Sequence, residues 1–122
     1  MNIEDFRLYC LSKPGVTEGF PFDETTLVFK LMGKMFVLTD TEDDFSIALK
    51  CDPEGAIELR ESYPAVQPGY HMNKTHWNTI TVDGSMSDKI LIELINHSYD
   101  LIKTGLTKKL KVELEEIEAK HQ

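Results

Sequence analysis

Two apolar segments with only two residues between them restrict the fold of this chain more than any other feature. Residues 25–32 and 35–39 are rich in β-branched, aromatic and long aliphatic side chains, and Gly33-Lys34 separates them. A two-residue loop that begins with glycine is typical of a type II′ β-hairpin. In the resulting register, alternate residues of the two strands form a predicted core face, which holds Leu27, Phe29, Leu31, Phe36 and Leu38.

The opposite face of this hairpin is also largely apolar, since it carries Val28, Lys30, Met32, Met35 and Val37. Such a face is either covered by another element or used as a contact surface. One candidate cover is the charged C-terminal segment, where Leu110, Leu114 and Ile117 recur at helical spacing.

The remaining elements follow from local signals. Residues 45–51 alternate between apolar and polar side chains and predict a third strand, and residues 78–82 predict another. Asp52-Pro53, an N-cap followed by proline, predicts a short helix that ends before Pro64.

Two longer helices are expected at the ends of the chain. Asn2 is expected to cap a first helix that stops at Pro14-Gly15, and Ser85 or Ser87 is expected to cap the longest one. Between the first helix and the hairpin, the aromatic residues of segment 19–22 are expected to tuck back onto the core.

These elements predict an α+β fold: a single two-layer domain in which helices pack on an antiparallel sheet. The predicted order is α-βββ-α-ββ-α, with the domain over residues 1–106 and a charged helical extension over residues 107–122. A chain of 122 residues is long enough to bury one core of this kind.

The charge of the chain limits its partners. There are 21 Asp and Glu against 13 Lys and Arg, which gives a formal net charge of -8. That balance argues against nucleic-acid binding through bulk positive charge. We expect neither a signal peptide nor a membrane span, because no apolar run approaches the ~20 residues that a span needs. We therefore expect a cytoplasmic monomer, with Cys10 and Cys51 as reduced thiols.

Two stretches depart from this acidity. Residues 25–39 and 62–82 contain no Asp or Glu, and the second stretch holds the only tryptophan and two of the four histidines. The sequence therefore predicts that an anionic ligand such as DNA would bind at these two stretches.

Several segments carry a resemblance to a known family. Residues 14–18, 20–22, 28–36, 59–64 and 68–79 resemble, in that order, the MmcQ/YjbR family. The resemblance implies a small α+β domain of frataxin-like (CyaY-like) or secretion-chaperone-like shape. It also implies a DNA-binding role through a "double wing" shape, and it brings no catalytic residues with it.

The leading hypothesis is weak binding of double-stranded DNA by a non-enzymatic domain, with or without a preference for sequence. If the hairpin and the strand at 78–82 are neighbours in the sheet, their lysines converge on one surface. Aromatic side chains there can stack on bases. The candidate site consists of Lys30, Lys34, Lys50, Tyr70, His71, Asn73, Lys74, His76 and Trp77, and Asn78 can add a hydrogen bond. The alternative from these residues is that Tyr70 and Trp77 are partly buried and that the lysines are ordinary solvated charges.

Other kinds of site receive less support. His71 and His76 are five residues apart, which suits neither one strand face nor one helix face, so no metal site or cofactor is expected. The frataxin-like resemblance implies iron held loosely by the surface carboxylates of residues 42–44, but an acidic loop of this length is more simply a solvated turn. No nucleophile elbow, phosphate-binding loop or dinucleotide motif is present, so no enzyme is expected. The alternative function is a protein-interaction or chaperone-like module that uses the Met-rich hairpin face.

Overall fold

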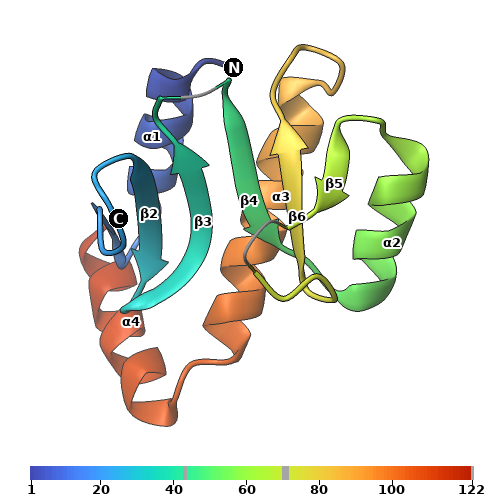
Figure 1. The fold of residues 1–122 in the computed structure, drawn as a ribbon. Helices are drawn as coiled ribbons and strands as arrows, with labels where there is room; N and C mark the ends of the chain where they lie inside the picture. The colour runs from blue at the N-terminus through green and yellow to red at the C-terminus, as the bar shows by residue number, and fades with distance from the viewer. Residues whose placement is uncertain (43, 70–71, 122) are drawn as a thin grey trace.

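The computed structural model describes residues 1–42, 44–69 and 72–121. Within these residues, one six-stranded antiparallel sheet has the order β1-β2-β3-β4-β6-β5 (Figure 1). The strands are β1 (Val16–Gly19), β2 (Thr26–Leu31), β3 (Lys34–Asp40), β4 (Ser46–Lys50), β5 (Val66–Pro68) and β6 (Trp77–Thr81). The helices are α1 (Ile3–Leu11), α2 (Pro53–Ser62), α3 (Asp88–Thr104) and α4 (Lys108–Lys120).

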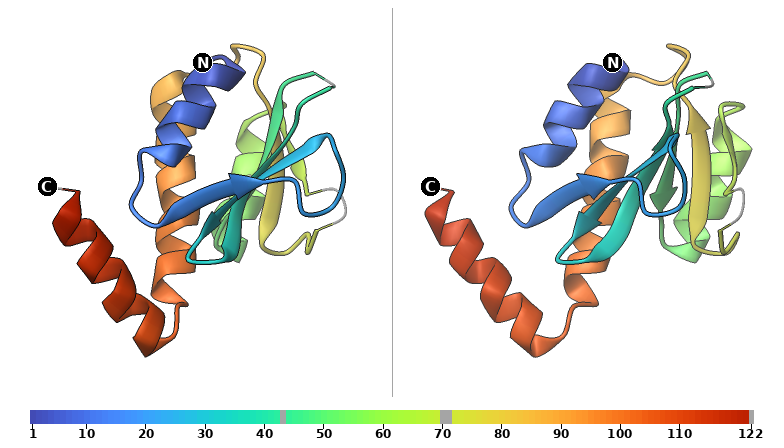
Figure 2. Two further views of the ribbon diagram at one scale, coloured as in Figure 1. Left: turned by 90° about the vertical axis from the view of Figure 1, so that its left-hand side faces the viewer. Right: turned by 60° about the vertical axis from the view of Figure 1, so that its left-hand side comes forward.

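The helices α1, α3 and α4 lie on the same side of the sheet (Figure 2). We call this side the inner face, and the core lies between it and the helices. Its largest fully buried members come from both layers: Phe6, Phe29, Phe36, Ile47, Ile80, Leu91 and Ile95. The predicted α+β domain with an antiparallel sheet is confirmed. No helix of the described residues is long and apolar enough to cross a membrane.

The predicted N-cap residues are confirmed by hydrogen bonds from their side chains to helix amides. The side chain of Asn2 accepts from the Asp5 amide at 2.8 Å, and that of Asp52 accepts from the Gly55 amide at 2.9 Å. At the start of α3 the cap is Ser87, which accepts from the Ile90 amide. Each cap satisfies a helix amide that has no partner within the helix.

The predicted register of the hairpin is wrong. Its two loop residues are Met32 and Gly33, at φ +50° and +86°, so that Leu31 pairs with Lys34. Positive φ at both positions is typical of a type I′ turn. Like the predicted type II′ turn, it matches the right-handed twist of hairpin strands. Phe29 pairs with Val37 while Lys30 pairs with Met35, which leaves Phe36 as an extra residue on β3.

This β-bulge at Phe36 exchanges the two faces along the rest of β3. Val37, predicted to face outward, is buried in the main core. Leu38, predicted to face the core, packs instead with Val28 and Trp77 on the opposite side of the sheet. An alternating pattern cannot reveal such an exchange, because Phe36, Val37 and Leu38 are all apolar.

The segment before the hairpin also differs from the prediction. Val16–Gly19 forms the edge strand β1, paired with β2, although only Val16 among its residues gives an apolar signal. The aromatic residues that follow do not tuck back onto the core: Phe20 is 51% and Phe22 63% exposed. The antiparallel pairing of β1 with β2 instead makes residues 20–25 the loop of a hairpin at the edge of the sheet.

The C-terminal helix α4 folds back on the domain. Leu114 is fully buried in the main core, and Lys103 on α3 forms an ion pair with Glu118 at 3.3 Å. On the opposite face of the hairpin, Val28 and Met35 pack in a separate cluster that, among the described residues, includes none from α4, so α4 does not cover that face. The division at residue 106 stays a prediction.

Candidate binding face

The face of the sheet opposite α1 and α3, which we call the outer face, has a small apolar cluster of its own. Its buried members are Val28, Leu38 and Trp77, from strands β2, β3 and β6. Met35, Ala48 and Met72 are half-buried and pack against them. The outer face is therefore apolar in the middle, as the sequence predicted for the hairpin, but with partly different residues.

Four lysines lie at one end of the sheet, which we call the lysine end. Lys30 and Lys50 are on the outer face, whereas Lys34 pairs with the inward-facing Leu31 and lies on the inner side. Lys34 begins β3, and Lys30 lies one pair further along on β2. Lys50 ends β4 and pairs with Trp77 at the start of β6, just after Lys74. The hairpin and β6 are not neighbours as the hypothesis supposed, because β4 lies between them. Since β4 itself supplies Lys50, the four residues still lie at the same end of adjacent strands.

The loop before β6 is held by its own backbone. The carbonyl of Asn73 accepts from the amides of His76 and Trp77, and its side chain accepts from the Thr75 amide at 2.8 Å. The carbonyl of His76 accepts from the Cys51 amide at 2.7 Å. The Asn73 side chain thus stabilises the conformation of the loop. Its predicted contact with a ligand stays a prediction. Lys74 projects from this loop and is exposed.

A second anchor for this loop is Arg60 on α2. Its guanidinium donates to the side-chain carbonyl of Asn78 at 2.6 Å and also to the backbone carbonyl of Lys74. The amide of Asn78 donates to the Ala56 carbonyl, and the residue is fully buried. Asn78 is therefore unavailable to a ligand, and the predicted hydrogen bond from it is wrong.

The sequence left open whether Trp77 faces a ligand or is partly buried, and its environment agrees fully with neither. It is 7% exposed, so most of the ring is committed to the outer-face cluster. Gly69 lies against it, and a Cβ there would come within 2.9 Å of the Trp77 Cβ. A ring held in this way can offer an edge to a ligand but not a free stacking surface. Tyr70 and His71 lie outside the described residues.

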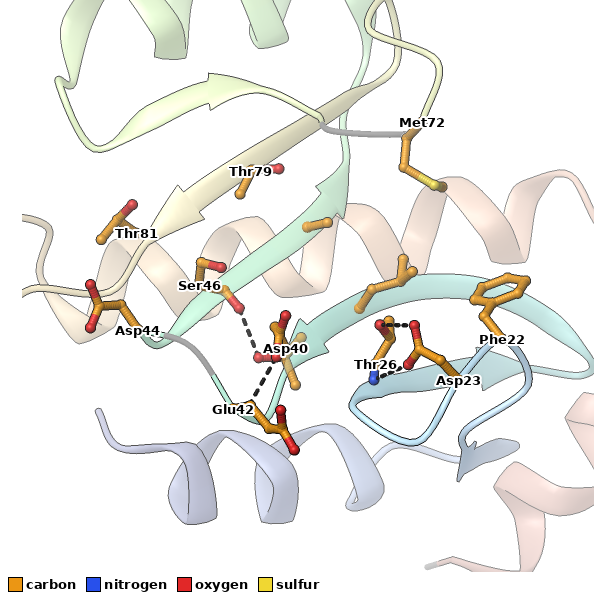
Figure 3. A pocket seen from close by; sticks show the side chains of 13 residues that line it. Phe22, Asp23, Thr26, Asp40, Glu42, Asp44, Ser46, Met72, Thr79 and Thr81 are labelled. Atoms are coloured by element: carbon orange, nitrogen blue, oxygen red, sulfur yellow. Dashed lines mark hydrogen bonds between the residues drawn. The ribbon is translucent and has the colours of Figure 1, made fainter.

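The other end of the outer face is acidic. A groove of about 1100 Å³ lies there over strands β2, β3, β4 and β6 (Figure 3). Leu38, Ala48 and Met72 form its apolar floor, and its rim includes Phe22. The carboxylates that line it, which we call the acidic end, are Asp23, Asp40, Glu42 and Asp44.

Asp23 is the most firmly held of these carboxylates. One oxygen accepts from the amides of Thr26 at 2.6 Å and Thr25 at 3.0 Å, and the other accepts from the Thr26 hydroxyl. The backbone bonds from Thr26 and then Thr25 lower the pKa of the Asp23 carboxyl, because they favour its charged form. Asp23 therefore keeps its negative charge at the mouth of the groove.

Sequence reasoning missed the acidic end as a site. The signal was present, because in an antiparallel meander the start of one strand lies beside the end of the next. Asp23 precedes β2, Asp40 ends β3 and Asp44 precedes β4, so connectivity alone places them together. For residues 42–44 the sequence suggests only a loose iron site or a solvated turn, without Asp23 or Asp40.

The fold and this face define a class of protein: a small α+β domain whose open sheet face carries separated basic and acidic ends. A family model named YjbR matches residues 11–101. Among relatives, "Uncharacterized protein YbdF" of Escherichia coli O157:H7 is 36% identical, over 87% of this chain and 88% of its own. "Uncharacterized protein YjbR" of Escherichia coli K12 is 33% identical, over 81% and 85%.

Solved structures agree with this match. The crystal structure of Deinococcus radiodurans protein DR2400, a DUF419 domain, is 44% identical with a TM-score of 0.87, over 93% of this chain and 88% of that one. A Pseudomonas syringae protein is 28% identical with a TM-score of 0.73, over 83% and 98%. The chain belongs to the YjbR family, as its resemblance predicted.

Proposed function

We propose that this chain is a cytoplasmic, monomeric and non-enzymatic binding module that contacts double-stranded DNA with its lysine end. The observation that carries this proposal is the convergence of Lys30, Lys34, Lys50 and Lys74 at one end of four adjacent strands. Lysine contacts to phosphates supply most of the affinity of non-specific DNA binding.

The acidic end decides how DNA would approach. Carboxylates at the far end of the same face repel phosphates, so a duplex along the strands would meet attraction at one end and repulsion at the other. We therefore place the duplex across the strand ends, over Lys34, Lys50 and Lys74. A contact with so few cations and a net charge of -8 implies weak, salt-sensitive binding.

The test is a titration of labelled duplex DNA at low and at physiological salt. The double variant Lys34→Ala/Lys74→Ala is expected to bind at least tenfold more weakly at low salt. Its log-log salt slope is expected to fall by about 0.9 for each phosphate that the variant no longer neutralises. The matched control is Lys108→Ala/Lys109→Ala, which removes the same charge from exposed positions on α4 and is expected to bind as the wild type does.

Two results would contradict the proposal. One is the absence of binding by the wild type at low salt. The other is an equal loss in both double variants, which would mean that total charge and not the lysine end governs the interaction.

The acidic groove favours a second candidate function, a protein-interaction module. Its apolar floor and carboxylate rim suit a segment with apolar and basic side chains, and Phe22 stands exposed at its edge. Phe22→Asp is expected to abolish recovery of a partner in a pull-down. Phe20→Asp, a change in the same loop at a residue that does not line the groove, is expected to leave recovery intact. Partners recovered equally by both variants would count against this use of the groove.

A further inference from the structure

A cysteine, an aspartate and a histidine meet on the helical side of the molecule, at the end of the sheet where Lys50 closes β4. Cys51 follows β4, Asp52 caps α2, and His97 lies on α3. The Asp52 Oδ1 atom is 3.0 Å from His97 Nε2 and 3.8 Å from Cys51 Sγ. The three candidate ligand atoms all lie within 4.8 Å of one another.

These distances suit a single zinc ion. Zinc binds cysteine sulfur at about 2.3 Å and histidine nitrogen or carboxylate oxygen at about 2.0–2.2 Å, in a tetrahedral arrangement. Neighbouring ligand atoms around such an ion are therefore about 3.3–3.7 Å apart. The two separations from Asp52 Oδ1 depart from that range by a few tenths of an ångström. The separation between Cys51 Sγ and the His97 nitrogen is within 4.8 Å and must shorten by up to about 1 Å, which rotation of the exposed His97 side chain can supply.

The local backbone holds the carboxylate in position. The Oδ2 atom of Asp52 accepts from the Gly55 amide, so Oδ1 is turned toward His97 and Cys51. A side chain at residue 55 would push the Asp52 carboxylate aside, since a Cβ there would lie 2.7 Å from Oδ1. Helix capping thus fixes one ligand, and a glycine leaves it the space it needs.

Burial and charge favour an ion that enters from solvent. Cys51 is only 6% exposed, while the side chains of Asp52 and His97 are 49% and 37% exposed. A thiolate and a carboxylate together would neutralise a divalent ion. Without an ion, burial and then the neighbouring Asp52 raise the pKa of the Cys51 thiol to about 11, so Cys51 is not an activated nucleophile.

We propose that Cys51, Asp52 and His97 form a zinc site with its fourth position open to solvent. Binding replaces the thiol proton, with the Cys51 sulfur forming a bond to Zn²⁺ and one proton released to solvent. The ion would join the end of β4 and the start of α2 to the middle of α3. Nothing in this proposal depends on whether the lysine end binds DNA.

The test uses the full chain, reduced and stripped of metal, titrated with CoCl₂ as a spectroscopic probe and then with ZnCl₂. We expect one equivalent of Co²⁺ to produce a thiolate-to-cobalt charge-transfer band that zinc then abolishes. Cys51→Ala is expected to lose the band. His97→Gln and Asp52→Asn are expected to bind at least tenfold more weakly, and asparagine at position 52 still caps α2. The control Cys10→Ala removes the other thiol and is expected to keep the band.

A second measurement addresses folding directly. At a hundredfold excess over the wild-type Kd, ZnCl₂ is expected to raise the Tm of the wild type by about 5 °C or more, and to raise that of His97→Gln by no more than about half as much. The proposal is overturned if cobalt gives no thiolate band in the wild type. It is also overturned if the band survives in Cys51→Ala, or if zinc shifts the Tm of His97→Gln as much as that of the wild type.

Discussion

The hydroxyl of Ser98 donates to the backbone carbonyl of Phe36 at 2.6 Å, across 62 positions of the sequence. The same oxygen accepts from the Lys50 amide at 3.0 Å. Phe36 is the extra residue of the bulge in β3, and Lys50 ends β4, so one buried hydroxyl serves two backbone groups where the strand pairing is interrupted. The bulge that exchanges the faces of β3 is thereby fastened to α3.

Ser98→Ala is expected to lower the free energy of unfolding by about 1–3 kcal/mol, because it leaves a buried carbonyl and a buried amide without their partner. Urea unfolding measures this change. Thr104→Ala is the control: its exposed hydroxyl bonds only to the Asp100 carbonyl in the same helix, and its effect is expected to stay within about 0.5 kcal/mol. Similar values for the two variants would show that the Ser98 bridge adds no stability.

Gly15→Ala is expected to weaken the packing of α4 on the domain. Gly15 has φ +79°, and a Cβ there would lie 2.8 Å from a methyl of Leu114 and 3.1 Å from the Met32 sulfur. Gly84→Ala introduces the same backbone strain at φ +87°, but the added Cβ would lie in open space. The difference between the two variants therefore measures the steric conflict alone.

We expect Gly84→Ala to cost about 1 kcal/mol and Gly15→Ala about 1–3 kcal/mol more. We also expect faster amide exchange along α4 in Gly15→Ala alone. Equal costs and an unchanged α4 would contradict the packing of Leu114 against this glycine.

Arg60→Ala is expected to destabilise the domain and loosen the loop that carries Lys74. It removes a charged donor from the buried Asn78 and from two backbone carbonyls, with an expected cost of about 2–3 kcal/mol. The control is Arg7→Ala, which breaks ion pairs with Glu18 and Glu4 between partly exposed side chains and is expected to cost under about 1 kcal/mol. Urea unfolding compares the two, and an equal loss would refute the anchoring role of Arg60.

Asp23 is expected to make part of the stability depend on pH. Its folded pKa is lowered by the Thr26 and Thr25 amides, while the unfolded pKa stays near the usual value of about 3.9. The lowered folded pKa means that its contribution is present above about pH 4 and is lost as pH falls through the folded value. Thermal unfolding between pH 7 and pH 2 should therefore show a smaller acid loss in Asp23→Asn than in the wild type. Parallel curves would contradict this.

The sequence predicted most of the fold because its signals are local. Asn2, Asp52 and the serine before α3 act on amides three residues away, and the alternation in β4 needs no knowledge of its neighbours. The edge strand β1 escaped detection because one apolar residue in four gives no alternation. The lysines that the sequence singles out lie at one end of the sheet, but their role as a binding site stays a prediction, and the sequence did not indicate the acidic end.

By itself, the sequence determined the α+β class, the helix starts, the glycine that closes the hairpin turn and the acid-free stretches at the lysine end. Only the tertiary structure decided which face of the hairpin is buried, since the Phe36 bulge exchanges Val37 and Leu38 within an apolar run. It also brought Cys51 and Asp52 to His97, 45 positions from Asp52. The physical reason is the same in both cases. Which of several locally possible arrangements is stable depends on hydrogen bonds and hydrophobic burial between distant elements. Such contacts produce no periodic pattern in the sequence.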